Sequence, residues 1–236
     1  MFQQDDKIVN YFIALVKAKK PVPPSKEYAL TELIGTGFLI GNNGYALTAA
    51  HVIEQLLENH NSATDAIAGT FVDTHWNVIE IEKYEMHPTE DVGIVKFRGS
   101  GWKSIVKIDP VAKHSAVEYV CWGYPHETAK EIQKLDPAAI IIPELIYTQG
   151  YVRRRISRQL YPTMIFRGTK FYELSEIVGG GNSGAPVLLK GTEAPFNVFG
   201  VYIGENEHVS YAVRLADICD WVPSILGKAI IDEANL

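Results

Sequence analysis

Short apolar runs separated by turn-forming residues recur along the whole chain. Many of these runs are rich in β-branched and aromatic residues, and glycine, proline and asparagine stand between them. This pattern is typical of β-strands joined by tight turns. It predicts strands at residues 11–16, 35–40, 45–48, 70–72, 78–81, 91–97, 117–122, 146–151, 164–166, 185–189, 198–203 and 209–213.

Helical patterns are short by comparison. Residues 51–58 place Val52, Leu56 and Leu57 close to one face and predict a short helix. The segment from about 126 to 144 is ambiguous, with some helical character. From about residue 216 the apolar positions predict a helix packed on the body, with a restart at Pro223. Many short strands with little helix between them favour a sandwich or barrel over alternating strands and helices.

Composition and charge exclude some functions. The chain has 236 residues, 47% hydrophobic and 21% charged, which is ordinary for a globular protein. The formal charge of −6 gives no electrostatic support for nucleic acid binding. A basic run at residues 153–158 (Arg153, Arg154, Arg155 and Arg158) is interpreted as a solvated strand face or loop.

Cysteines and the N-terminus bear on the compartment. The two cysteines, Cys121 and Cys219, are interpreted as buried thiols, although one disulfide between them stays open. The N-terminal segment has acidic residues where a signal peptide has basic ones, and no apolar run is long enough to span a bilayer. We therefore expect a cytoplasmic protein without a membrane partner; a secreted chain trimmed of its signal would look the same.

The segment from Gly179 to Pro186 is the first candidate for chemistry, with Ser183 flanked by glycines before an apolar strand. Serine is a weak nucleophile that needs a positioned base. Glycines let the backbone bend so that two N–H groups can point at one developing negative charge, and here these would be the N–H groups of Gly181 and Ser183. The alternative for this segment alone is a glycine-rich hairpin turn.

Two further residues could serve such a serine. His51 follows an apolar strand and small residues, and its ordinary pKa of about 6.5 suits a base that takes and returns a proton. Asp91 stands immediately before a buried-looking strand, where it could bind the far ring nitrogen of the histidine. No histidine has metal-ligand spacing, so we expect no metal and no cofactor.

Together these motifs resemble the trypsin/chymotrypsin family. The order is His, Asp, Ser, with 40 residues from His51 to Asp91 and 92 from Asp91 to Ser183. Thr48-Ala49-Ala50-His51, Asp91-Val92-Gly93-Ile94-Val95 and Gly181-Asn182-Ser183-Gly184-Ala185-Pro186 match the three signature motifs. The order and Ala185 both argue against an α/β-hydrolase.

The resemblance implies an all-β fold of two six-stranded antiparallel β-barrels with a C-terminal helix. The N-terminal barrel is expected at residues 8–105, the C-terminal barrel at 114–215 and the helix at 216–236. It also implies a serine endopeptidase that forms an acyl-enzyme, with His51, Asp91 and Ser183 as its triad and Gly181 and Ser183 as oxyanion donors.

The chain is most similar to HtrA-like bacterial peptidases. Residues 35–48, Trp122-Gly123-Tyr124-Pro125 and Ser210-Tyr211-Ala212-Val213 resemble their barrel landmarks. HtrA proteins usually add a PDZ domain, for which too few residues remain, so a single peptidase module is expected. Asn182 stands where secreted trypsins have an aspartate that pairs with a freshly cut N-terminus, so activity is expected to be independent of that cleavage.

The resemblance places substrate binding around the loop before Ser183 and two later strands. The residues implied are Ile177, Tyr202, Ile203, Gly204, Ser210 and Tyr211. Ile177 falls at the base of the primary pocket, which would leave a basic side chain unpaired and favours small or apolar P1 residues. Glu176 or Glu205 could overturn this preference. Substrates are expected to bind as an added strand along residues 202–204.

Three hypotheses follow for the function. The first is an active endopeptidase acting on a protein or peptide substrate. The second is a non-catalytic binding module that keeps the fold. The third is an enzyme that is latent until a regulatory protein partner orders the oxyanion loop, which three consecutive glycines make flexible. A misplaced Gly181 N–H group beside a normal His51–Ser183 pair would indicate the third.

Overall fold

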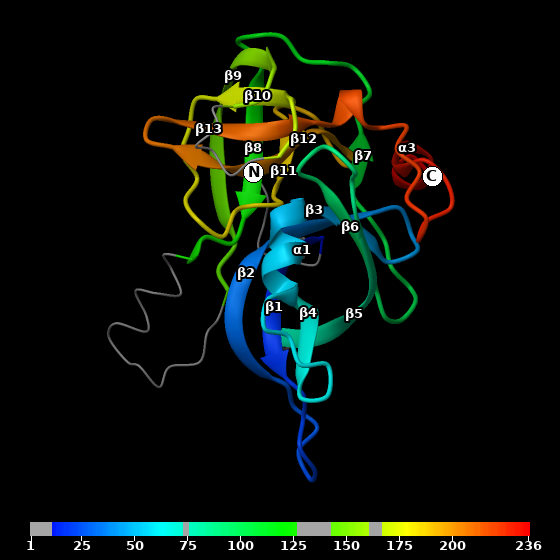
Figure 1. The fold of residues 1–236 in the computed structure, drawn as a ribbon. Coiled ribbons are helices and arrows are strands. Elements are labelled where there is room, and N and C mark those ends of the chain that lie inside the picture. Colours follow the sequence, from blue (N-terminus) through cyan, green and yellow to red (C-terminus); the bar gives the residue numbers. More distant parts are fainter. Residues whose placement is uncertain (1–10, 73–75, 127–142, 161–166) are drawn as a thin grey trace.

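The fold consists of two β-barrels packed against each other, with the helix α1 at their junction (Figure 1). The structure is a computed structural model that describes residues 11–72, 76–126, 143–160 and 167–236. The N-terminal barrel carries the blue and cyan strands in Figure 1, and the C-terminal barrel the green to orange ones. The predicted two-barrel fold is therefore confirmed.

The N-terminal barrel has the strand order β1-β2-β3-β6-β5-β4 and closes through antiparallel pairing of β1 with β4. A hairpin turn at residues 41–44 joins β2 to β3, with Phe38 opposite Leu47. Phe12, Phe38 and Phe97 are fully buried in this half of the molecule. The strands are β1 (Phe12–Lys19), β2 (Ala29–Ile40), β3 (Tyr45–Thr48), β4 (Asp65–Val72), β5 (Trp76–Met86) and β6 (Gly93–Phe97).

The C-terminal barrel has the order β11-β8-β9-β10-β13-β12 and closes through the pairing of β11 with β12. Aromatic residues fill its interior, where Tyr172 and Phe199 meet edge to face at 5.4 Å between ring centroids. The strands are β8 (Glu118–Gly123), β9 (Ile146–Ser157), β10 (Lys170–Leu174), β11 (Pro186–Leu189), β12 (Phe196–Asn206) and β13 (Val209–Arg214).

The link between the barrels contains a strand that the sequence did not suggest. β7 (Val106–Ile108) lies within the polar stretch expected to be a plain connection, and it pairs in parallel with β12. β10 was also missed. The strand expected at 164–166 and most of the ambiguous segment at 126–144 lie outside the described residues.

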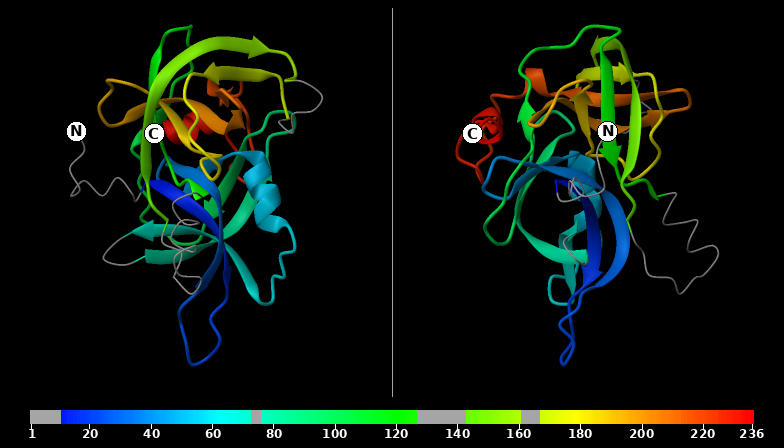
Figure 2. Two further views of the ribbon diagram at one scale, coloured as in Figure 1. Left: turned by 90° about the vertical axis from the view of Figure 1, so that its left-hand side faces the viewer. Right: turned by 180° about the vertical axis from the view of Figure 1, so that it is seen from behind.

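The C-terminal helix is present but much shorter than the predicted span of 216–236. A 3₁₀ turn η3 (Leu215–Asp217) follows β13, and only α3 (Ile230–Ala234) is α-helical. Proline has no N–H group to continue a helix, and at Pro223 the chain instead makes a separate turn in which its carbonyl oxygen accepts the N–H groups of Leu226 and Gly227. The right-hand view in Figure 2 shows α3 at the side of the molecule.

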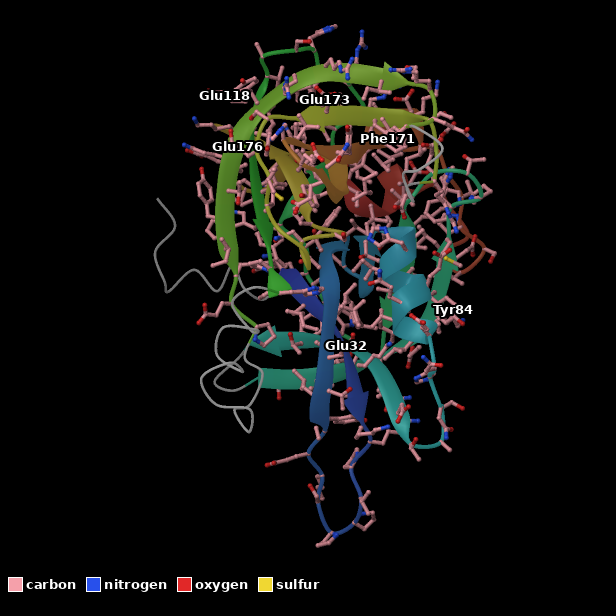
Figure 3. The ribbon with its side chains drawn as sticks, turned by 60° about the vertical axis from the view of Figure 1, so that its left-hand side comes forward. Glu32, Tyr84, Glu118, Phe171, Glu173 and Glu176 are labelled. Atoms are coloured by element: carbon pink, nitrogen blue, oxygen red, sulfur yellow. The ribbon has the colours of Figure 1, made fainter. Side chains whose placement is uncertain are left out.

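Glutamates join α3 and the basic run to the rest of the fold. Glu233 of α3 is fully buried and binds Asn43 at 2.9 Å and Lys228 at 2.8 Å. On the C-terminal barrel, Glu173 of β10 (labelled in Figure 3) lies 2.7 Å from Arg154 and 3.5 Å from Arg153.

Within the described part of the chain, no helix has both the length and the apolar character needed to cross a membrane.

Candidate active site

His51 is held at the point where β3 gives way to α1 (Ala50–Leu57). The helix buries Val52, Ile53 and Leu56 against the N-terminal barrel, which confirms the predicted short helix and fixes its first turn. The His51 side chain itself is 22% exposed. The base candidate therefore stands on a rigid element with one side accessible.

Asp91 binds His51 through both carboxylate oxygens. Oδ1 accepts the His51 backbone N–H at 3.0 Å, and Oδ2 lies 2.7 Å from the ring nitrogen Nδ1. The Asp91 side chain is only 2% exposed. Because an ionised carboxylate can only accept, Nδ1 carries the proton and Nε2 of the neutral ring is left as an acceptor. This is the tautomer that a general base acting through Nε2 requires.

Ser183 belongs to the C-terminal barrel, and its backbone is hydrogen-bonded to the N-terminal barrel. Its carbonyl oxygen accepts the N–H of Thr36 on β2 at 2.8 Å. Its hydroxyl donates to the carbonyl oxygen of Ile203 at 3.3 Å, and not to His51. Catalytic hydrogen bonds in ligand-free sites are often long and tighten only when substrate binds.

The loop before Ser183 has a fixed peptide orientation. The Gly180 carbonyl oxygen accepts the N–H of His126 at 2.6 Å. In a trans peptide the C=O and N–H groups point in opposite directions, so the Gly181 N–H is turned away from His126. Gly181 has a φ of +95°, and a Cβ there would lie 2.5 Å from the Tyr124 carbonyl oxygen. Only glycine fits this position.

Asn182 binds within the same loop. Its amide nitrogen donates to the carbonyl oxygens of Val178 at 2.6 Å and Gly179 at 3.0 Å, and the residue is fully buried. The side chain that replaces the expected aspartate therefore closes the loop locally, with neutral hydrogen bonds in place of an ion pair.

The predicted substrate-binding residues fall into two groups. Tyr202, Ile203, Ser210 and Tyr211 are all at least 95% buried on β12 and β13, and Gly204 pairs with Tyr211. Ile177 differs, because its side chain is 45% exposed. The Ser210 hydroxyl donates a hydrogen bond of 2.6 Å to the carbonyl oxygen of Glu176, the residue before Ile177. Ile177 is therefore accessible to solvent, and its place at the base of the primary pocket stays a prediction.

Glu205 lies at this loop as well. Its Oε2 accepts the Gly179 N–H at 3.0 Å and the Tyr202 hydroxyl at 3.0 Å. The carboxylate therefore joins the end of β12 to the glycine loop, a contact that no sequence pattern indicates.

Thr36 is a site residue to which the sequence analysis assigned no role. It is fully buried, and its hydroxyl accepts the Tyr124 N–H at 3.0 Å and donates to the Gly181 carbonyl oxygen at 3.0 Å. One side chain thus fixes the loop of Gly181 to both barrels. The available signal was a polar residue between two glycines inside an otherwise apolar strand.

Comparisons with known proteins agree with this arrangement. The model of the trypsin-like peptidase domain matches residues 35–194, which include all three triad candidates. The chain belongs to the trypsin-like peptidase family. No curated protein matches it by sequence.

Solved structures with the same fold cover nearly all of this trypsin-like chain. Deg5 aligns over 94% of it and 93% of its own chain, with a TM-score of 0.64 and 16% identity. The MamO protease domain from Magnetospirillum magneticum, in its apo form, covers 90% and 96% (TM-score 0.59, 13% identity). The active form of the Rv3671c protease from M. tuberculosis covers 94% and 83% (0.58, 16%). At these identities the likeness shows the two-barrel fold, and the closer resemblance to HtrA-like peptidases stays a prediction.

The described residues contain no candidate metal site. Among the residues that the structure describes, no three or more histidine, cysteine, aspartate or glutamate side chains are grouped so that they could hold an ion.

Proposed function

We propose that this trypsin-like protein is a serine endopeptidase that uses His51, Asp91 and Ser183 as its triad. The observation that carries the proposal is the buried Asp91 carboxylate, 2.7 Å from His51 Nδ1. A buried charge needs a partner, and here its partner is the group that a general base mechanism requires.

In the proposed mechanism, Ser183 Oγ attacks the carbonyl carbon of the scissile peptide bond while His51 Nε2 takes the hydroxyl proton. Asp91 stabilises the imidazolium that forms. The N–H groups of Gly181 and Ser183 donate to the oxyanion, each contributing about 3–4 kcal/mol. The imidazolium then protonates the leaving amine. Water, activated by the same histidine, releases the acyl group from Ser183.

The end of β12 supports binding of an extended peptide. The ladder with β11 ends at Pro186 opposite Val201, and the pairing with β13 shifts register between Tyr202 and Gly204. Beyond Tyr202, no described strand pairs with β12 on the side facing β11, and there the Ile203 carbonyl already receives the Ser183 hydroxyl. Such an edge beside the nucleophile suits main-chain recognition of a substrate strand.

For the P1 residue we propose a small or apolar side chain. Glu205 is the acid that could attract a basic residue, but its Oε2 is already engaged by Gly179 and Tyr202. Peptides with alanine, valine, arginine or lysine at P1, tested on the wild type and on Glu205→Gln, decide this point. Faster cleavage after arginine or lysine that is lost in Glu205→Gln would overturn the preference.

One observation favours the alternative of a latent or non-catalytic module, namely the Ser183 hydroxyl bonded to Ile203. The sign expected for latency was a misplaced Gly181 N–H beside a normal His51–Ser183 pair. Here the Gly180 carbonyl is held by His126, and it is the Ser183 hydroxyl that is bonded to a partner other than His51. A change of one rotamer costs far less than rebuilding a loop, so the active enzyme is the better supported hypothesis.

A fluorescent fluorophosphonate tests the proposal, because it bonds rapidly only to an activated serine. The wild type, Ser183→Ala and His51→Ala are treated in parallel, with and without a protein extract. Labelling of the wild type that both variants lose supports the endopeptidase. Labelling only after the extract is added supports latency, and no labelling in either case supports a binding module.

A further inference from the structure

Glu90, the residue before Asp91, is bound by the opposite barrel. Glu90 is only 5% exposed. Its Oε2 accepts the backbone N–H groups of Thr169 at 2.9 Å and of Lys170 at 3.1 Å. A carboxylate buried to this extent is retained only when donors satisfy it. Both donors stand at the start of β10, so the contact spans the two barrels.

The approach of the two segments is very close. Gly168 has a φ of +105°, and a Cβ there would lie 2.3 Å from Glu90 Oε2 and 3.2 Å from its Cα. The neighbouring Arg167 binds Glu54, which lies on α1 three residues after His51. Residues 167–170, here called the clip, therefore contact both elements that carry triad residues of the N-terminal barrel.

The loop that holds Glu90 and Asp91 is short and closed. His87 N–H donates to the Val92 carbonyl oxygen at 2.8 Å, and His87 Nδ1 accepts the Glu90 N–H at 3.0 Å. Two consecutive residues thus point to different partners, Glu90 to the clip and Asp91 to His51. A displacement of Glu90 must displace the backbone of Asp91.

Packing alone does not hold this loop. A cavity of about 750 Å³ lies beside the clip and is lined by His87, Glu90, Arg167 and Trp221, among others. On that side the hydrogen bonds from the clip hold Glu90, in addition to the bonds within the loop and those from His51 to Asp91.

We propose that Glu90 is a positioning residue, which holds Asp91 at hydrogen-bonding distance from His51 by binding the clip of the C-terminal barrel. The inference deepens the proposed function, and its catalytic consequence rests on it. Misplacement of a catalytic group by about 1 Å can cost on the order of 100-fold in rate.

The test compares Glu90→Ala with Glu90→Gln and with Glu85→Ala. The glutamine can still accept both N–H groups. Glu85 is the matched control, because its carboxylate also accepts a hydroxyl and a backbone N–H, those of Ser224 and Ile225, but away from Asp91. Two quantities are measured: the fluorophosphonate labelling kinetics, separated into kinact and KI, and the low-field proton resonance of the His51 Nδ1–H bonded to Asp91, assigned by its loss in Asp91→Asn.

We expect Glu90→Ala to lower kinact by about 10- to 100-fold with KI unchanged. The low-field resonance should shift or broaden, while Glu90→Gln and Glu85→Ala keep both values near those of the wild type. If Glu90→Ala does not fold, Glu90→Asp replaces it, since a carboxylate shorter by one methylene is withdrawn from the clip. An unchanged resonance in folded Glu90→Ala or Glu90→Asp overturns the proposal. The resonance decides this even if the wild type labels nothing, so failure of the proposed function is recognised separately.

Discussion

Thr36→Val removes one buried hydroxyl and leaves the shape of the side chain almost unchanged. Valine keeps the β-branched form that suits strand β2. It can neither accept the Tyr124 N–H nor donate to the Gly181 carbonyl oxygen, and both of these hydrogen bonds are 3.0 Å long. The substitution therefore tests whether this hydroxyl fixes the loop of Gly181.

The cost follows from the groups left without partners. An unpaired buried N–H at Tyr124 costs about 1–3 kcal/mol, and the lost bond to Gly181 about 0.5–1.5 kcal/mol. Together the free energy of unfolding should fall by about 2–4 kcal/mol, which lowers Tm by about 4–16 °C in a chain of this length. The rate of labelling by fluorophosphonate should fall. Complete loss of one oxyanion donor lowers a rate by about 10²- to 10³-fold, so the fall should not exceed this.

Thr70→Val is the matched control. Thr70 is equally buried in the same barrel, but the hydrogen bond of its hydroxyl, to the Ala14 carbonyl oxygen, is 3.4 Å long. Urea unfolding should show a loss below about 1 kcal/mol for this variant, with an unchanged labelling rate. Equal losses of stability in the two variants, or normal labelling of Thr36→Val, would refute the reasoning.

Three further outcomes are expected. Burial opposes the charge of Glu85, but hydrogen bonds from Ser224 and the adjacent backbone outweigh it and lower its pKa; its stabilisation is complete above the ordinary glutamate pKa of about 4.3 and is lost as pH falls through the lower folded value. Urea titrations between pH 6 and 3 should show this loss in the wild type and less of it in Glu85→Gln. Burial raises the pKa of the Cys121 thiol to about 12 and also raises that of the partly exposed Cys219, both of which are free; iodoacetamide and mass spectrometry should find slow modification of Cys219 alone until the protein is unfolded. Glu233→Ala should lower the free energy of unfolding, measured in urea, by about 2 kcal/mol, because it removes the buried carboxylate that binds Asn43 and Lys228. An unchanged urea midpoint would contradict this.

The barrels and the His51–Asp91 pair were accessible from sequence because both depend on local patterns. Short apolar runs bounded by turn-forming residues mark most strands, and each triad candidate lies in a short motif that needs no knowledge of distant residues. β7 and β10 were missed for the opposite reason. β7 has only three residues, and β10 sets charged residues beside aromatic ones, so both are specified by the strands that receive them.

The supports of the site could not be predicted in the same way. Thr36 and Gly181 are 145 residues apart, and Glu90 and Thr169 are 79 apart. No role was predicted for Glu90 from the sequence, and the strand predicted from Asp91 begins later, with β6 at Gly93. The helix of the last 21 residues was overestimated because its apolar spacing is also met by irregular chain packed on a body, and Pro223 decided the outcome.

The linker strand β7 has a consequence for how the molecule can be controlled. It is paired with β12 on one side, and on the other the Ile108 N–H and carbonyl meet the Asn235 amide at 3.0 and 3.3 Å. A strand held from both sides cannot act as a hinge, so we expect residues 106–108 to keep their position relative to β12 when a ligand binds. A ligand that moved one barrel against the other would therefore have to bend the chain outside β7 or break these hydrogen bonds.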